Sequence, residues 1–193
     1  MVTSQVIYLG FLASLACERI GELMLSRRNA RRAFAQGALE VGQRHFRAMA
    51  SFHTLFIASC GFEMWFLHRS FPGLLGWAAY AGALGAQALR YWVIFTLKER
   101  WNVRVIVLPN AAPVTSGPFR LMRHPNYLAV VLETLCVPLA HGCWLTAMLF
   151  SLGNAALLTV RIRVEERALG TQYAAAFADF PRFLPRLRRG HTH

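Results

Sequence analysis

The sequence predicts an all-α integral membrane protein that forms a single membrane domain over residues 1–193. Hydrophobic residues make up 55% of the chain and charged residues only 16%, whereas soluble domains carry about 25% charged residues. The apolar residues fall in long blocks, and a membrane-spanning helix requires about 20 such residues. Basic residues lie between the blocks, so the net charge of +12 reflects membrane topology and not nucleic-acid binding, which gathers basic residues on one soluble face.

We expect five membrane-spanning helices, some of marginal length. They cover Val2–Leu25, Phe46–Leu67, Gly73–Leu97, Tyr127–Ala140 and Cys143–Val160. Residues 1–100 therefore hold three N-terminal spans, and residues 101–193 hold a long loop, two further spans and a tail. The fourth span is short, and Pro138 should end or kink it. Because only two residues separate the fourth and fifth spans, these two should form a tight helical hairpin.

The basic residues predict the orientation of these spans. Of the 21 lysine and arginine residues, 18 lie in the first loop, the third loop and the tail, and one, Arg69, lies in the second loop. The positive-inside rule places the basic loops and the tail in the cytoplasm and the N-terminus outside. The four cysteines form no CxxC pair and lie mostly in apolar runs, so neither a disulfide framework nor a metal site is expected.

Several polar side chains fall inside the spans, mostly in their cytoplasmic halves. They are Glu18, Arg19, Glu22, His53, Gln87, Arg90, Glu133 and Asn154. Ionisable groups are costly in hydrocarbon and normally face a bundle interior or a wet cavity. The set predicts a polar cavity that opens to the cytoplasm, with Arg90 and Glu133 as candidate substrate-binding residues. The alternative is that these charges pair between helices and serve only to assemble the bundle.

The segment Val114–Tyr127, with the sequence VTSGPFRLMRHPNY, carries the most information. Gly117 is followed by proline, which predicts a turn. Pro125 disfavours helix at His124, so a helix should begin with Pro125 in its first turn. Arg123 and His124 would stand at the mouth of this helix, where free backbone N–H groups favour an anion. The simpler alternative is a loop at the membrane edge whose arginines face lipid phosphates.

The third loop and the tail complete the expected architecture. Residues 103–108 should form a short extended segment that lies over the site. The tail begins as a helix, on which Arg161 and Glu165 share one face at i,i+4 spacing. Three aromatic residues then predict an amphipathic surface helix, and two prolines predict its end. These five residues are Tyr173, Phe177, Phe180, Pro181 and Pro185.

Two motifs together resemble the isoprenylcysteine carboxyl methyltransferase (ICMT) family of integral-membrane, S-adenosylmethionine-dependent enzymes. They are GPFRLMRHPNY at 117–127 and RIRVEERAL at 161–169, and a short hairpin separates them. The resemblance covers roughly Trp101–Pro185. Two N-terminal segments, ERIGELMLSRRN at 18–29 and RHFRAMASFH at 44–53, are similar to a bacterial branch of this family. That branch is associated with type III polyketide synthases and with O-methylation of long-chain alkylpyrones or related phenolic lipids.

The resemblance implies a binding site for S-adenosylmethionine and a lipophilic acceptor in the bacterial inner membrane. The residues it assigns to the cofactor are Arg104, Val114, Phe119, His124, Pro125, Asn126, Tyr127 and Glu165. It places Arg161 on the acceptor side, so that Arg161 and His124 are the candidate catalytic residues. The family usually has tyrosine where Phe119 stands. The acceptor would be of the alkylpyrone or isoprenylcysteine type, and a polyketide synthase would be a partner in the pathway.

Other functions are compatible with the same residues. Phospholipid N-methyltransferases have a similar C-terminal layout and would accept amine headgroups. A relative of the sterol reductases would bind NADPH in place of the methyl donor. A non-enzymatic scaffold or transport subunit would use the intramembrane charges for assembly, bind no cofactor and tolerate Glu165→Gln.

Overall fold

The structure is a computed structural model that describes residues 2–109 and 111–183, and this part of the chain forms five α-helices and one two-stranded sheet. The helices are α1 (Val2–Ala35), α2 (Gln43–Phe66), α3 (Leu74–Leu97), α4 (Pro125–Leu139) and α5 (Trp144–Ala176). The strands are β1 (Leu39–Val41) and β2 (Val105–Val107), and the short 3-10 turns are η1 (Lys98–Arg100) and η2 (Gly117–Arg120).

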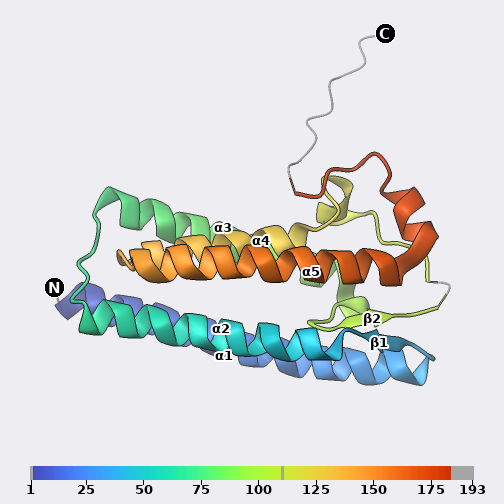
Figure 1. Ribbon diagram of the computed structural model, residues 1–193, viewed down its shortest axis with the longest axis horizontal. Coiled ribbons are helices and arrows are strands. Elements are labelled where there is room, and N and C mark those ends of the chain that lie inside the picture. Colours follow the sequence, from blue (N-terminus) through green and yellow to red (C-terminus); the bar gives the residue numbers. More distant parts are fainter. Residues whose placement is uncertain (1, 110, 184–193) are drawn as a thin grey trace, which may run out of the picture.

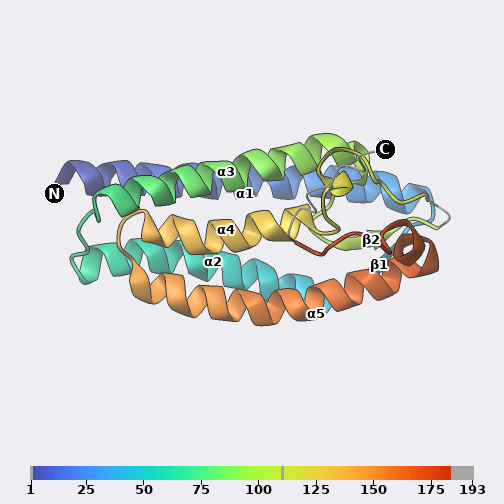
Figure 2. The same ribbon diagram turned by 90° about the horizontal axis from the view of Figure 1, so that it is seen from above.

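The helices lie in two layers along the long axis of the molecule. In Figure 1 α1 and α2 form the lower layer, and α3, α4 and α5 form the upper layer. Figure 2 shows α1 beside α2, and α4 between α3 and α5. The N-terminus and the α2–α3 and α4–α5 connections lie at one end, whereas the sheet and the C-terminal part of α5 lie at the other. The first loop, the third loop and the tail therefore share one end, as their basic residues predicted.

Each predicted span corresponds to one helix. α4 begins with Pro125 and ends at Leu139, directly after Pro138, so both proline predictions are confirmed. α1 and α5 contain 34 and 33 residues, which makes them about 50 Å long, and both continue beyond the predicted spans. In the part of the chain that the structure describes, only α5 meets a length and hydropathy test for a membrane span, and α4 is a shorter apolar helix. The number of spans therefore stays a prediction.

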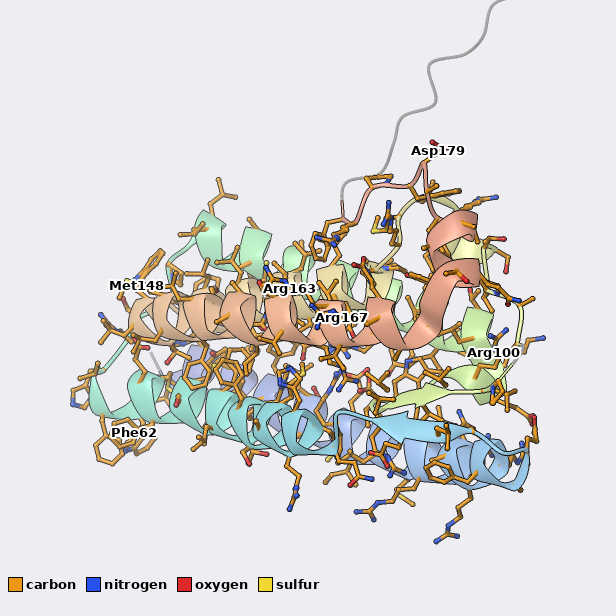
Figure 3. The ribbon with its side chains drawn as sticks, turned by 45° about the vertical axis from the view of Figure 1, so that its right-hand side comes forward. Phe62, Arg100, Met148, Arg163, Arg167 and Asp179 are labelled. Atoms are coloured by element: carbon orange, nitrogen blue, oxygen red, sulfur yellow. The ribbon has the colours of Figure 1, made fainter. Side chains whose placement is uncertain are left out.

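Large apolar side chains join the two layers at the end away from the sheet. Tyr8, Phe56 and Met64 belong to a buried cluster with residues of α3 and α4. The hydroxyl of Tyr8 donates to the carbonyl of Val137 at 3.1 Å. Other apolar side chains on these helices face outward, such as Phe62 at 61% exposed, which projects from α2 in Figure 3. Buried and outward-facing apolar groups together are what a lipid-embedded bundle requires.

Glu63 caps the first turn of α5 from a neighbouring helix. Its two carboxylate oxygens accept the backbone N–H groups of Leu145 at 3.1 Å and Thr146 at 2.6 Å, and Arg69 pairs with it at 2.9 Å. The first N–H groups of a helix have no partner within that helix, so this carboxylate satisfies two of them. Glu63 is therefore a structural residue at the end opposite the sheet.

The sheet joins the first and third loops. β1 and β2 are antiparallel, with Leu39 opposite Val107 and Val41 opposite Val105. The expectation of an extended segment at residues 103–108 is confirmed by β2, but the sequence did not predict its partner β1. Turn η2 contains Gly117 at φ +57°, where a Cβ atom would meet Oγ1 of Thr96 at 2.3 Å. Glycine is therefore required by conformation and by space.

The tail departs from the predicted surface helix. α5 runs through the fifth span to Ala176, and Gly170 at φ 71° and ψ −163° bends it. Phe177 follows the helix and is fully buried, so it packs into the protein and does not lie on a surface. The chain then turns back across the mouth of α4. Pro185, which was predicted to stop the helix, lies outside the described residues.

Candidate functional site

A cavity of about 910 Å³ lies where the two layers, the sheet and the tail meet. Along α1 its lining extends from Ala16 to Ala33, a rise of about 25 Å for seventeen residues. Ten of the eleven residues predicted to bind ligands or act in catalysis line it: Arg90, Arg104, Val114, Phe119, His124, Pro125, Asn126, Tyr127, Arg161 and Glu165. Glu133 does not line the cavity but pairs with Arg90. The structure therefore brings these residues from four separate segments into one site.

Tyr127 connects the two candidate residues of α5. Its hydroxyl donates to Oε2 of Glu165 and accepts from Nε of Arg161 at 3.2 Å. Arg161 also donates from Nη2 to the carbonyl of Val103 at 2.7 Å, which ties α5 to the loop before β2. These contacts fix a guanidinium and a carboxylate side by side, with a hydroxyl between them.

Arg161 carries a positive charge that no carboxylate of the described residues contacts directly. It is 5% exposed, and its hydrogen-bond partners among the described residues are a carbonyl and a hydroxyl, both neutral. Within residues 2–109 and 111–183 it forms no ion pair with a carboxylate. Burying an ionised group without a counter-charge is costly. An anion that enters the cavity would therefore bind favourably at Arg161.

The backbone N–H groups of Arg123 and His124 at the mouth of α4 are not free for an anion, contrary to the expectation for these two residues. The N–H of Arg123 donates to the carbonyl of Pro181 at 2.9 Å, and the N–H of His124 donates to the carbonyl of Arg182 at 3.1 Å. The Arg123 side chain donates to the carbonyls of Phe180 at 2.7 Å and Ala178 at 3.2 Å. The returning tail occupies these donors, and sequence alone gave no sign that it would.

Glu166 fastens the tail to the site. Nε2 of His124 lies 3.0 Å from its Oε1, and Arg182 contacts both of its oxygens at 3.2 and 2.8 Å. Burial alone would raise the pKa of Glu166, but hydrogen bonds from Arg182 and His124 hold that pKa below its ordinary value. Glu166 is thus ionised and accepts from both partners. His124 lines the cavity, but its Nε2 is committed to this carboxylate.

The donor set around the cavity suits a ligand with both polar and apolar parts. Oδ1 of Asn126 is buried without a hydrogen-bond partner among the described residues. Glu165 lines the cavity, and within residues 2–109 and 111–183 its one hydrogen bond comes from the hydroxyl of Tyr127. Phe119 packs with Trp101 and supplies an apolar wall. An unsatisfied amide oxygen, a carboxylate and an aromatic surface together fit the amino-acid and adenosine parts of S-adenosylmethionine.

Arg104 differs from the other predicted cofactor residues because its charge is paired. It forms a salt bridge with Glu40 at 2.9 Å, and its guanidinium lies 5.7 Å from the ring centre of Phe34. Both contacts come from the first loop and its flanking helix. Arg104 therefore holds the sheet over the cavity as well as lining it.

Sequence reasoning missed the residues that hold the third loop in place. The side chain of Asn29 donates to the carbonyls of Lys98 at 3.0 Å and Trp101 at 2.9 Å, and Ser26 donates to Asn102 at 2.7 Å. The available signal was the i,i+3 spacing of these two polar residues beyond the predicted end of the first span. That spacing places both on one face of a longer helix.

The deep end of the cavity is polar. Arg19, Glu22 and Arg90 line it, and they form salt bridges both within α1 and between helices. Arg19 contacts Glu22 at 2.9 Å and Glu133 at 3.8 Å, and Arg90 pairs with Glu133. The polar cavity and the interhelical salt bridges are therefore both present, made by the same residues, and the expectation that the cavity faces the cytoplasm stays a prediction.

Comparison with known proteins agrees with this geometry. Residues 78–171 match the isoprenylcysteine carboxyl methyltransferase (ICMT) family. The chain is 37% identical over 158 residues to the uncharacterized protein YpbQ of Bacillus subtilis (strain 168), an alignment that covers 82% of this chain and 94% of that protein. It is 29% identical over 160 residues to an uncharacterized protein of Haemophilus influenzae, with 81% and 91% covered.

The chain belongs to the ICMT family, a family of membrane methyltransferases. The match spans α3, the third loop, α4 and most of α5, which contribute most of the site described above. Membership supports a membrane protein and a methyltransferase. The relatives named here carry no information on the acceptor.

Proposed function

We propose that this protein is an integral-membrane, S-adenosylmethionine-dependent O-methyltransferase whose acceptor is a lipophilic molecule with an ionisable oxygen. The observation that carries this proposal is Arg161, a buried guanidinium with neutral partners among the described residues. An acceptor carboxylate, enolate or phenolate would supply the missing negative charge. An ammonium headgroup would be repelled, so Arg161 argues against phospholipid N-methylation.

Asn126 and Glu165 are the residues we assign to the cofactor. When bound, S-adenosylmethionine would supply a methyl group on a positively charged sulfur. The Glu165 carboxylate would bind an ammonium group, and the unpartnered Oδ1 of Asn126 would accept a hydrogen bond. Phe119 and Val114 would cover the apolar parts, and the buried pair His124 and Pro125 would shape the wall at the start of α4.

Arg161 would act on the acceptor by charge and orientation. A guanidinium beside an acidic oxygen favours its ionised form, and an ionised oxygen needs no general base. Tyr127 keeps Arg161 and Glu165 in fixed positions through its hydroxyl. Correct placement of the two reactants is the main requirement of methyl transfer and is a large source of rate enhancement. His124 would support the site through Glu166.

The proposed setting is the bacterial inner membrane, with the N-terminus outside and the C-terminus in the cytoplasm. The collection of the basic loops and the tail at one end of the bundle supports this orientation (Figure 1). The methyl donor would enter from the cytoplasm and the acceptor from the bilayer. An alkylpyrone-like lipid made by a polyketide synthase is the acceptor class we would screen first, followed by isoprenylcysteine-like acids.

Calorimetry of S-adenosylmethionine binding to detergent-purified protein tests the proposal, with NADPH titrated in parallel. We expect saturable binding of the methyl donor, a loss of about tenfold or more in affinity for Glu165→Gln, and no heat from NADPH. Arg163→Gln is the matched control, because Arg163 lies on the same helix (Figure 3) but is exposed. Arg161→Gln should retain donor binding and lose methyl transfer. Folded protein that binds NADPH, or neither compound, would overturn the proposal.

A further inference from the structure

Three charged groups at the deep end of the cavity have unused hydrogen-bonding atoms. Nε of Arg19, Nε of Arg90 and Oε1 of Glu22 are buried without a hydrogen-bond partner among the described residues. Arg90 and Glu22 are 5% and 7% exposed. Their unpartnered atoms face each other at 3.7 Å, which is too long for a hydrogen bond. Such groups are costly to leave unsatisfied, so a partner from outside the chain is expected.

Assembly of the helices leaves these three atoms without hydrogen bonds among the described residues, although Nε of Arg90 and Oε1 of Glu22 form a long ion pair between α3 and α1. Nη2 of Arg90 already pairs with Glu133, and Nη1 of Arg19 already pairs with Oε2 of Glu22 at 2.9 Å. The Arg90–Glu133 pair joins α3 to α4, and Nη1 of Arg19 joins α1 to α4 at 3.8 Å from Oε2 of Glu133, so these links use other atoms of the same side chains. The unmade hydrogen bonds are therefore additional to these links, and the residues that carry them line the cavity.

The chemistry of the unpartnered atoms selects a neutral group that both donates and accepts. The two arginine Nε–H groups donate, and the carboxylate oxygen of Glu22 accepts. An anionic ligand would face this carboxylate, and the cluster already holds three carboxylates, Glu18, Glu22 and Glu133, against two arginines, Arg19 and Arg90. An ammonium ligand would face the two arginines. A hydroxyl group satisfies donors and acceptor together without adding charge.

We propose that the deep end of the cavity binds a hydroxyl group on the apolar body of the acceptor, so that the enzyme selects hydroxylated lipophilic acids or phenols over plain alkyl ones. This inference rests on the proposed function, because it treats Arg161 as the other end of the acceptor site. α4 passes from Tyr127 to Glu133 in six residues, a rise of about 9 Å. The hydroxyl would lie about that far from the methylated oxygen, with Val93 and Val130 lining the stretch between.

Displacement of a fluorescent fatty acid, cis-parinaric acid, from the purified protein tests the inference without requiring methyl transfer. The competitors are a fatty acid with a mid-chain hydroxyl, its methyl ether and the unsubstituted acid of the same chain length. We expect the hydroxy acid to compete about tenfold or more better than the other two. In Glu22→Gln the advantage over the ether should shrink toward one, because an amide N–H donates to an ether oxygen.

Glu63→Gln is the matched control, since this carboxylate is also buried between helices but lies at the opposite end of the bundle. It should leave the hydroxyl preference unchanged. Equal competition by the three ligands with wild-type protein would overturn the inference even if Glu22→Gln does not fold. Calorimetry with S-adenosylmethionine on the same preparations separates the two ideas. Donor binding without hydroxyl preference would leave the proposed function standing, and hydroxyl preference without donor binding would refute only that function.

Discussion

Replacing Tyr127 by Phe tests the centre of the site through the loss of one oxygen atom. The hydroxyl contacts both Glu165 and Arg161, whereas the ring packs against Leu158 and Ile162, so the variant should fold. Two hydrogen bonds to charged groups are lost, each worth about 1.5 kcal/mol at the lower end of the range for charged partners. Their sum of about 3 kcal/mol corresponds to roughly a 150-fold reduction in kcat/KM.

The assay is transfer of labelled methyl from S-adenosylmethionine to a lipophilic acid by purified protein in nanodiscs. We expect kcat/KM of Tyr127→Phe to fall by about two orders of magnitude, with the fold retained in a thermal melt. Tyr80→Phe is the control, because Tyr80 packs on the apolar cluster away from the cavity. A kcat/KM within about threefold of wild type, in folded protein, would refute the role given to the hydroxyl.

Three further predictions concern stability. Glu63→Ala should lower stability by about 2 kcal/mol, because two N–H groups of α5 lose their acceptor, and a thermal melt should show this while donor binding is unchanged. Glu166→Gln should lower the melting temperature at neutral pH only. The pKa of the Glu166 carboxyl is depressed in the folded protein. The stabilisation that this carboxylate gives the fold is therefore fully present above its unfolded pKa of about 4.3, and it is lost as pH falls through the folded pKa. A difference that persists at lower pH would contradict this. Gly117→Ala should destabilise the fold by more than about 1 kcal/mol, because φ is positive there and the Thr96 side chain fills the space that a Cβ atom would need. Gly10→Ala is the control and should not destabilise the fold, because an added Cβ atom at Gly10 meets no described atom within 4 Å.

Hydropathy and the effect of proline on neighbouring residues were sufficient to predict the helices and the start of α4. The position of Pro125 depends only on the steric effect of proline on its neighbour, and the structure places it at the first residue of the helix. The convergence of Glu165 and Tyr127 needed more than local rules. The resemblance to the ICMT family assigned both residues to one cofactor site. A periodic pattern alone would have placed them on two separate helices and predicted no contact between them.

The features that sequence did not predict all depend on contacts between distant residues. β1 is three residues long and is defined by pairing with β2, so no local pattern marks it. The burial of Phe177 and the capture of the backbone of Arg123 depend on the bend at Gly170. A tail with aromatic residues at helical spacing reads equally well as a surface helix or as a segment that folds back, and only tertiary packing decides between them.

The charge of the partner distinguishes the arginines that stabilise the fold from the arginine that we assign to ligand binding, whereas the number of arginines does not. The net charge of +12 follows from membrane topology and says nothing of the role of any one residue. Arg90 and Arg104 are matched by Glu133 and Glu40, so their charge is satisfied within the chain and stabilises helix and sheet contacts. Arg161 is as deeply buried as Arg90, yet its hydrogen-bond partners are neutral. Because a buried charge is costly without a partner of opposite sign, we propose that an acidic acceptor supplies the direct counter-charge of Arg161.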